Sequence, residues 1–187
     1  MHLQAINNAL IFAWVALELF LSLYKRSKSK GQQDHSSLRI IWVTLIIAIL
    51  AANWVADHHR IMPFSNQVLT QSIALICFIT GFVIRYHSIY TLKQFFTFDV
   101  HVGAEHELIT QGLYRKIRHP AYLGSLLIIT ALALQFGNLL SFLIVLILAI
   151  AVHVYRIRIE EAALMQHFGQ KYMTYKKGTW RLVPWIY

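Results

Sequence analysis

The feature that most constrains this chain is the recurrence of long apolar segments separated by polar stretches. A hydrocarbon core of roughly 30 Å needs about twenty apolar residues in helical form. Residues 3–24, 38–56 and 68–90 meet this requirement, and we expect each of them to span a membrane. Because unpaired backbone groups are costly in lipid, the sequence predicts an all-α integral membrane protein.

Two further apolar runs, residues 120–134 and 139–155, flank a short break at residues 135–138 that contains Gly137 and Asn138. This pattern predicts a helical hairpin, which brings the count to about five transmembrane helices; a re-entrant hairpin is the alternative. With 57% hydrophobic residues, we expect one membrane domain over residues 1–187. Residues 1–90 hold the first three spans, and residues 91–187 hold the motifs described below.

The basic residues sit between and after the apolar segments, so the formal charge of +9 indicates topology and not nucleic-acid binding. If the chain crosses the membrane at these segments, all but Arg60 of the seventeen Lys and Arg residues fall on one side of it or at its interface. The positive-inside rule then places the 91–119 loop and the C-terminal tail in the cytoplasm. No basic region precedes the first apolar segment and no small-residue cleavage site follows it, so we expect it to be a span.

Two charges interrupt the apolar segments. Glu18 lies six residues before the end of the first span, and Arg85 lies five residues before the end of the third. Both therefore sit roughly 8–9 Å inside the bilayer, and we expect a structural ion pair, with a substrate-facing role as the alternative. Cys77 is the single cysteine and excludes an internal disulfide, so we expect it to be a packing residue.

The first motif joins the polar loop to the fourth apolar run, at Arg118-His119-Pro120. Proline suits the first position of a helix, and the N–H groups of that first turn can bind an anion such as a carboxylate. A basic cluster that snorkels at the end of a span is the simpler alternative.

The second motif lies where the last apolar run meets the tail. Arg156 and Glu160 are four residues apart and share a helical face with His153, whereas Arg158 points elsewhere. An interfacial salt bridge would produce the same spacing.

Together the two motifs resemble the isoprenylcysteine carboxyl methyltransferase family and its relatives among membrane phospholipid methyltransferases. The resemblance covers roughly residues 94–187. It rests on His106-Glu-Leu-Ile109, Gly112, Tyr114, Arg118-His119-Pro120-x-Tyr122, Arg156 with Glu160 and Glu161, Phe168-Gly169-x-x-Tyr172-x-x-Tyr175, and Arg181-Leu-x-Pro184.

The resemblance implies S-adenosylmethionine as cofactor. The residues that match the family's cofactor pocket are His106, Glu107, Leu108, Ile109, Tyr114, His119, Pro120, Ala121, Tyr122 and Glu160. The family directs the arginine that matches Arg156 toward the acceptor carboxylate, so Arg156 and His119 are the expected catalytic residues. Near the place of an upstream cofactor-contacting glutamine, this chain has Asp99 or His101.

The expected acceptor is lipophilic, most simply the carboxylate of an isoprenylcysteine-like molecule or peptide, with membrane lipids as surroundings. Transfer from a sulfonium to a carboxylate cancels opposite charges, so a water-poor pocket favours it and no general base is needed. An amine or thiol acceptor would need a base, for which His119 and Glu161 are the nearest candidates.

Three other functions stay open. A phospholipid or small-molecule methyltransferase of the same fold would act on an amine or a thiol. A sterol-reductase-like enzyme would use NADPH, and a non-catalytic protein would only bind lipid. The eight glycines form no G-x-G arrangement, which argues against a dinucleotide-type loop. The histidines lack the spacing of metal ligands, so we expect no metal.

Overall fold

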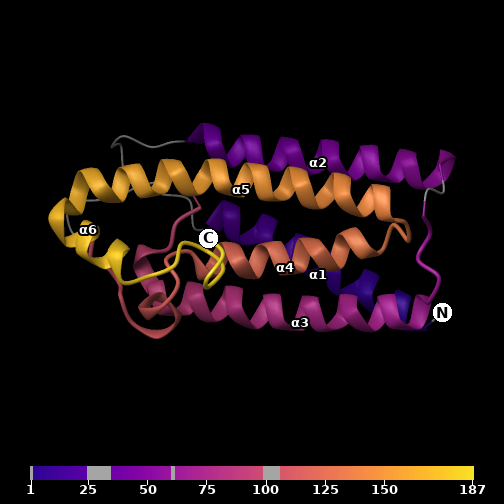
Figure 1. The fold of residues 1–187 in the computed structure, drawn as a ribbon, viewed down its shortest axis with the longest axis horizontal. Coiled ribbons are helices and arrows are strands. Elements are labelled where there is room, and N and C mark those ends of the chain that lie inside the picture. The colour runs from indigo at the N-terminus through magenta and orange to yellow at the C-terminus, as the bar shows by residue number, and fades with distance from the viewer. Residues whose placement is uncertain (1, 25–34, 60–61, 99–105) are drawn as a thin grey trace.

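The computed structural model describes residues 2–24, 35–59, 62–98 and 106–187. Over these residues the secondary structure is helical, as predicted (Figure 1). The elements are α1 (His2–Tyr24), α2 (His35–His58), α3 (Gln67–Leu92), the 3₁₀ helices η1 (Lys93–Phe95) and η2 (Gly112–Arg115), α4 (Pro120–Leu134), α5 (Leu139–Phe168) and α6 (Gln170–Lys177).

Four of these helices, α1, α2, α3 and α5, are long and apolar enough to cross a membrane. The protein is therefore a multi-pass integral membrane protein. The expected fifth span is shorter: α4 has 15 residues, about 22 Å of helix against a core of roughly 30 Å. The prediction of about five spans is thus confirmed for four helices, and the fifth is a shorter apolar helix.

The helix bounds follow the predicted segments closely except at the end of α5. This helix continues thirteen residues beyond Tyr155, to Phe168. The added segment contains neither glycine nor proline and is rich in strong helix formers. It ends at Gly169, whose positive φ of 49° is a backbone conformation that glycine adopts easily. Arg156 and Glu160 consequently lie on a continuous helix.

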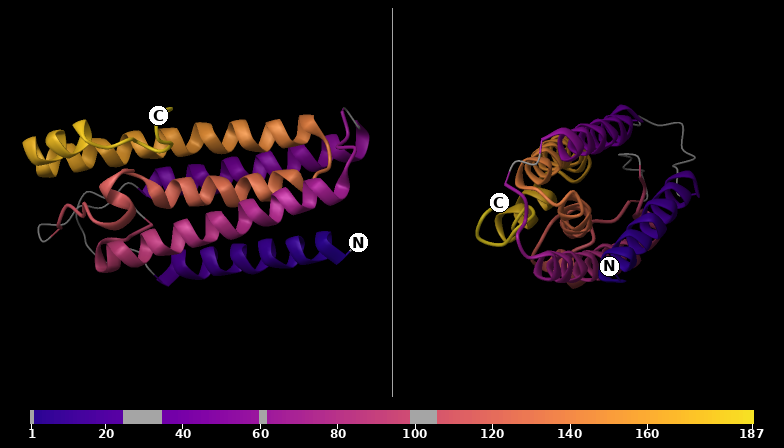
Figure 2. Two further views of the ribbon diagram at one scale, coloured as in Figure 1. Left: turned by 60° about the horizontal axis from the view of Figure 1, so that its bottom comes forward. Right: turned by 90° about the vertical axis from the view of Figure 1, so that its right-hand side faces the viewer.

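The membrane helices pack in the order α2, α5, α4, α3, α1, which the end-on view follows around the bundle (Figure 2). The contact between α3 and α4 is especially close at Gly81 and Gly124. A Cβ on Gly124 would lie 2.6 Å from the backbone nitrogen of Arg85 and 2.7 Å from the carbonyl oxygen of Gly81. These glycines bring Arg85 against the first turns of α4. Cys77 packs against the apolar core, as predicted.

The loops and short elements gather at the two ends of the bundle. At one end, the α2–α3 turn meets the α4–α5 turn, because Phe64 N–H donates to Gly137 O at 2.9 Å and Leu139 N–H to Met62 O at 3.2 Å. The start of α4, η2, α6 and the C-terminal tail lie at the opposite end (Figure 1). We call this the motif end, because it carries the motifs of the second half of the chain.

Candidate functional site

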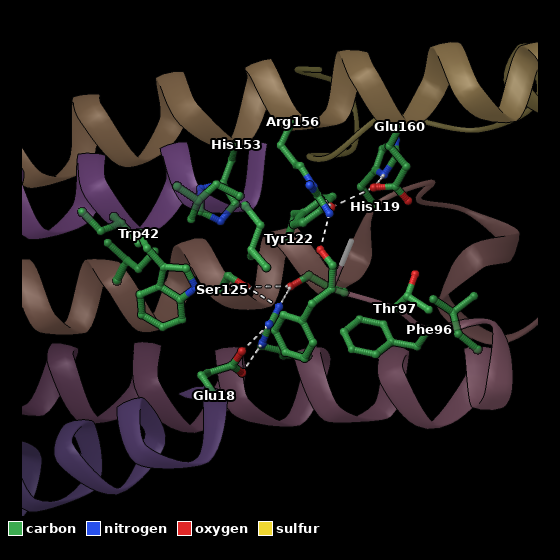
Figure 3. Close-up of a pocket in the computed structure, with 18 of the residues that line it drawn as sticks. Glu18, Trp42, Phe96, Thr97, His119, Tyr122, Ser125, His153, Arg156 and Glu160 are labelled. Atoms are coloured by element: carbon green, nitrogen blue, oxygen red, sulfur yellow. Dashed lines mark hydrogen bonds and ion pairs between the residues drawn. The ribbon is translucent and has the colours of Figure 1, made fainter. Parts of the chain in front are cut away.

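A cavity of about 390 Å³ lies inside the bundle (Figure 3). It receives side chains from α1 to α5 and from the segment after η1. Along α4 it extends from His119 to Leu132, about 20 Å of helix. Its deeper part is apolar, with Trp14, Trp42, Leu45, Ile49, Ile129 and Leu132 in its wall. Its motif end is polar and carries His119, Tyr122, Arg156 and Glu160.

The two intramembrane charges form the expected ion pair. Arg85 donates from Nε and Nη2 to the two carboxylate oxygens of Glu18, at 2.6 and 2.5 Å. Its Nη1 donates to Ser125 Oγ at 2.5 Å, and Tyr86 donates to Glu18 at 3.0 Å. Both charged residues are buried, and both also line the cavity. The pair thus ties α1 to α3 and α4 while placing polar groups in the cavity wall.

Arg156 joins three parts of the site. Its Nε donates to the Tyr122 hydroxyl at 3.3 Å, and its terminal nitrogens donate to Ser37 Oγ and to the Phe98 carbonyl oxygen. Tyr122 in turn donates to Glu160 at 2.8 Å. The guanidinium is therefore fixed between α2, α4 and the segment after η1, with its side chain in the cavity wall (Figure 3).

The adjacent acids Glu160 and Glu161 have different surroundings. Glu160 lines the cavity, with its side chain 31% exposed. Glu161 is buried between the segment before α4 and the C-terminal part of the chain. It pairs with Arg118 Nε at 2.9 Å, Arg181 Nη2 at 2.9 Å and Lys176 Nζ at 3.7 Å. With its carboxylate held by these cations, Glu161 serves to fix the tail and is poorly placed for the proton-accepting role considered from the sequence.

The tail pairs with the segment that leads into α4. Arg118 N–H donates to Trp180 O at 2.8 Å, His119 N–H donates to Arg181 O at 3.1 Å, and Trp180 N–H donates to Lys116 O at 2.9 Å. These bonds hold His119 at the N-cap of α4, directly before Pro120, which occupies the expected first helical position.

The His119 side chain is buried against the two acids. Its Nε2 has no hydrogen-bond partner among the described residues and lies 3.5 Å from the Glu161 carboxylate. Its Nδ1 lies 3.9 Å from Glu160.

A small hollow of about 50 Å³ adjoins the motif end of the cavity. The two share His106, Tyr114, Arg118, Glu160 and Leu164 as wall residues. The rest of the hollow is lined by Glu107, Leu108, Ile109, Tyr172 and Tyr175.

Two tyrosines of α6 close the hollow. Tyr175 donates to the Tyr114 carbonyl oxygen at 2.6 Å, and burial raises the pKa of Tyr175 to about 12. Burial also raises the pKa of Tyr172, whose hydroxyl has no hydrogen-bond partner among the described residues. Both phenols are therefore neutral near pH 7, and the Tyr172 hydroxyl is available to a ligand in the hollow.

The structure brings most of the residues singled out from the sequence to one place. The cavity wall includes His106, Tyr114, His119, Ala121, Tyr122, Arg156 and Glu160, and the hollow adds Glu107, Leu108 and Ile109. Pro120 is buried at the start of α4 and lines neither. Asp99 and His101 lie outside the described residues. Over the described ranges, no group of three or more His, Cys, Asp or Glu side chains could hold a metal ion.

Apart from the substrate-facing alternative for Glu18 and Arg85, sequence reasoning missed the contribution of the first half of the chain to the site. The cavity wall takes Trp14 and Leu19 from α1 and Trp42 from α2, together with Phe96 after η1. His153 was recognised as sharing a face with Arg156, but it received no role. Its position on a face shared with two motif residues was the signal that could have marked it.

The fold and the site together define a membrane-embedded helical bundle around an amphiphilic cavity, apolar at depth and charged at one end. The family model for phospholipid methyltransferases matches residues 69–171, more than half of the chain. The protein belongs to this family of membrane methyltransferases, which confirms the resemblance seen in the sequence.

Individual relatives agree with this assignment. The chain is 32% identical over 117 residues to Protein-S-isoprenylcysteine O-methyltransferase A of Arabidopsis thaliana, covering 62% of this chain and 59% of that protein. It is 26% identical over 194 residues to Methanethiol S-methyltransferase 1 of Bradyrhizobium diazoefficiens, a match that covers 96% of this chain and 67% of that protein. It thus spans about three fifths of the plant relative's length.

Among solved structures, the fold matches the eukaryotic intramembrane Ras methyltransferase, an isoprenylcysteine carboxyl methyltransferase, with a TM-score of 0.57. The two are 26% identical, and the match covers 82% of this chain and 54% of the other.

Proposed function

We propose that this protein transfers a methyl group from S-adenosylmethionine to a lipophilic acceptor held in the intramembrane cavity. The observation that carries the proposal is that the two spaces adjoin: the hollow lined by residues 106–109 shares five wall residues with the polar end of a long apolar cavity. A polar cofactor and an apolar acceptor can therefore meet at Tyr122, Arg156 and Glu160.

The residues of the hollow suit a zwitterionic, hydroxyl-bearing cofactor. The Tyr172 hydroxyl is a buried polar atom of the hollow with no hydrogen-bond partner among the described residues, and such an atom is costly unless a ligand pairs with it. The Glu160 carboxylate is partly open and can accept hydrogen bonds from hydroxyl groups. When bound, S-adenosylmethionine would supply a methyl group on a positively charged sulfur.

The acceptor's apolar chain would occupy the deep part of the cavity, with its reactive group next to Arg156. For a carboxylate such as that of an isoprenylcysteine, the guanidinium orients the acceptor, and the dry wall strips water from the nucleophile. A thiol is the second candidate, favoured by the similarity to a methanethiol S-methyltransferase over 96% of the chain. The positive-inside pattern supports a cytoplasmic motif end.

Cofactor choice is tested by thermal unfolding of the detergent-purified protein with S-adenosylmethionine, its demethylated product or NADPH. A ligand at 100 times its Kd stabilises the folded state by about 2.7 kcal/mol, so the melting temperature should rise with the first two. A rise with NADPH alone would overturn the proposal.

The proposed roles, Glu160 for the cofactor and Arg156 for the acceptor, are tested with three variants. Activity is measured as transfer of labelled methyl to farnesylcysteine analogues and to lipid extract. Glu160→Gln should weaken cofactor binding. Arg156→Lys should mainly raise the KM for the acceptor, and Arg158→Lys, on the exposed side of the same helix, should change neither. Equal loss of cofactor affinity in the first two variants would contradict the division. Methylation of lipid amines but not of prenylcysteine would remove the carboxylate as acceptor.

A further inference from the structure

His153 lies in the cavity wall one helical turn deeper than Arg156, and the functional argument above gives it no role. The residue is only 3% exposed. Figure 3 shows its ring extending from α5 into the cavity, between Trp42 and Tyr122. A buried histidine in the wall of a reaction cavity, beside the expected position of the acceptor, is placed for proton transfer.

The hydrogen bond of the ring fixes which nitrogen is basic. His153 Nδ1 lies 2.8 Å from the carbonyl oxygen of Ala149, one turn earlier on α5. A carbonyl oxygen can only accept, so Nδ1 carries the hydrogen, and the lone pair of the neutral ring is on Nε2. Because Nδ1 is held by the helix backbone, Nε2 is the nitrogen that the ring presents to the cavity.

The position of the ring relative to the polar groups suits the acceptor side of the site. The Tyr122 ring contacts the His153 ring edge-on at 5.7 Å and the His119 ring in a stacked arrangement at 5.7 Å. Tyr122 thus separates His119, at the N-cap of α4, from His153, which lies one helical turn deeper than Arg156. An acceptor head group beside Tyr122 and Arg156 would be within reach of Nε2.

We propose that His153 is the proton acceptor that enables this site to methylate a lipophilic thiol, an inference that rests on the proposed function. A carboxylate is already ionised and needs no base, whereas a thiol with a pKa near 8.5 is mostly protonated at neutral pH, and its thiolate is the nucleophile. An amine acceptor would also need a base, and the similarity to a methanethiol S-methyltransferase over 96% of the chain favours the thiol.

The step balances without a further reactant. The S–H bond of the acceptor breaks and its proton bonds to Nε2 of His153, while the sulfur electron pair forms the new S–CH₃ bond. The bond between the methyl group and the cofactor sulfur breaks, and its electron pair stays on that sulfur, which becomes a neutral thioether. The imidazolium then returns its proton to water once the products leave.

The test compares three acceptors in the unaltered protein, in one variant and in a control variant. Transfer of labelled methyl from S-adenosylmethionine is measured with a long-chain alkanethiol, with an apolar aryl thiol that is ionised at the assay pH, and with farnesylcysteine. His153→Gln should lower kcat/KM for the alkanethiol by about 10²–10⁴-fold, the usual contribution of a general base. The other two acceptors should change by less than about threefold. His167→Gln, at an exposed histidine of the same helix, is the matched control.

The outcomes separate this inference from the proposed function. An equal fall for all three acceptors in His153→Gln would show a structural role and overturn the inference, as would an unchanged alkanethiol rate. Methylation of farnesylcysteine but of neither thiol by the unaltered protein would overturn the inference alone. Failure to bind S-adenosylmethionine would overturn the proposed function itself.

Discussion

Replacing Glu161 should release the tail from the start of α4. Its carboxylate is buried and lies 2.9 Å from both Arg118 and Arg181. Glu161→Gln keeps the shape of the side chain but removes the charge that both guanidinium groups face. Removing one partner of a buried ion pair costs about 3–5 kcal/mol. We expect the lower end of this range, about 3 kcal/mol, because Arg181 is partly exposed.

Amide hydrogen exchange measures this release directly. The N–H groups of Arg118, His119 and Trp180 make the hydrogen bonds that join the tail to the 116–119 segment. If these bonds open together, a loss of about 3 kcal/mol should speed their exchange by about 100-fold. Glu160→Gln is the matched control, because the Glu160 carboxylate accepts a hydrogen bond from Tyr122 and makes none to the tail. Unchanged exchange in Glu161→Gln, or an equal increase in Glu160→Gln, would refute the reasoning.

Three further changes test the packing. Glu18→Gln leaves Arg85 buried without its carboxylate and should lower the free energy of unfolding, measured by denaturation in detergent, by about 3–5 kcal/mol. The double variant Glu18→Gln with Arg85→Met should recover part of that lost free energy. Gly124→Ala puts a Cβ 2.6 Å from a backbone nitrogen of α3 and should lower the melting temperature, whereas Gly178→Ala, with its nearest contact at 4.0 Å, should not. Burial raises the pKa of Tyr175 from 10 to about 12, so its contribution to the free energy of unfolding should be intact below pH 10 and lost as the pH rises through 12. Unfolding experiments at pH 9 and 12 should therefore show a smaller alkaline loss of stability in Tyr175→Phe.

The parts of the fold that the sequence could predict depend on strong local rules. Pro120 fixes the start of α4, and the break before Leu139 marks the turn into α5. Because a charge at membrane depth needs a partner, the matching depths of Glu18 and Arg85 were enough to predict their ion pair. Helical spacing placed Arg156 and Glu160 on one face, and both line the cavity.

Other parts of the site depend on tertiary contacts that local rules do not encode. A side chain of α2 that faces lipid and one that faces an apolar cavity look alike in a sequence, so Trp42 carried no signal. Glu160 and Glu161 are chemically identical neighbours, and only the folded tail assigns the first to the cavity and the second to Arg181. The length of α5 was underestimated because the prediction ended the helix with its apolar run.

The pairing of the tail with residues 116–119 also bears on how the site is completed during synthesis. Trp180 and Arg181 follow every other described element of the site along the chain, yet they hold the backbone at the start of α4. A growing chain can therefore insert all its membrane helices before the backbone ahead of α4 has gained its hydrogen bonds to the tail.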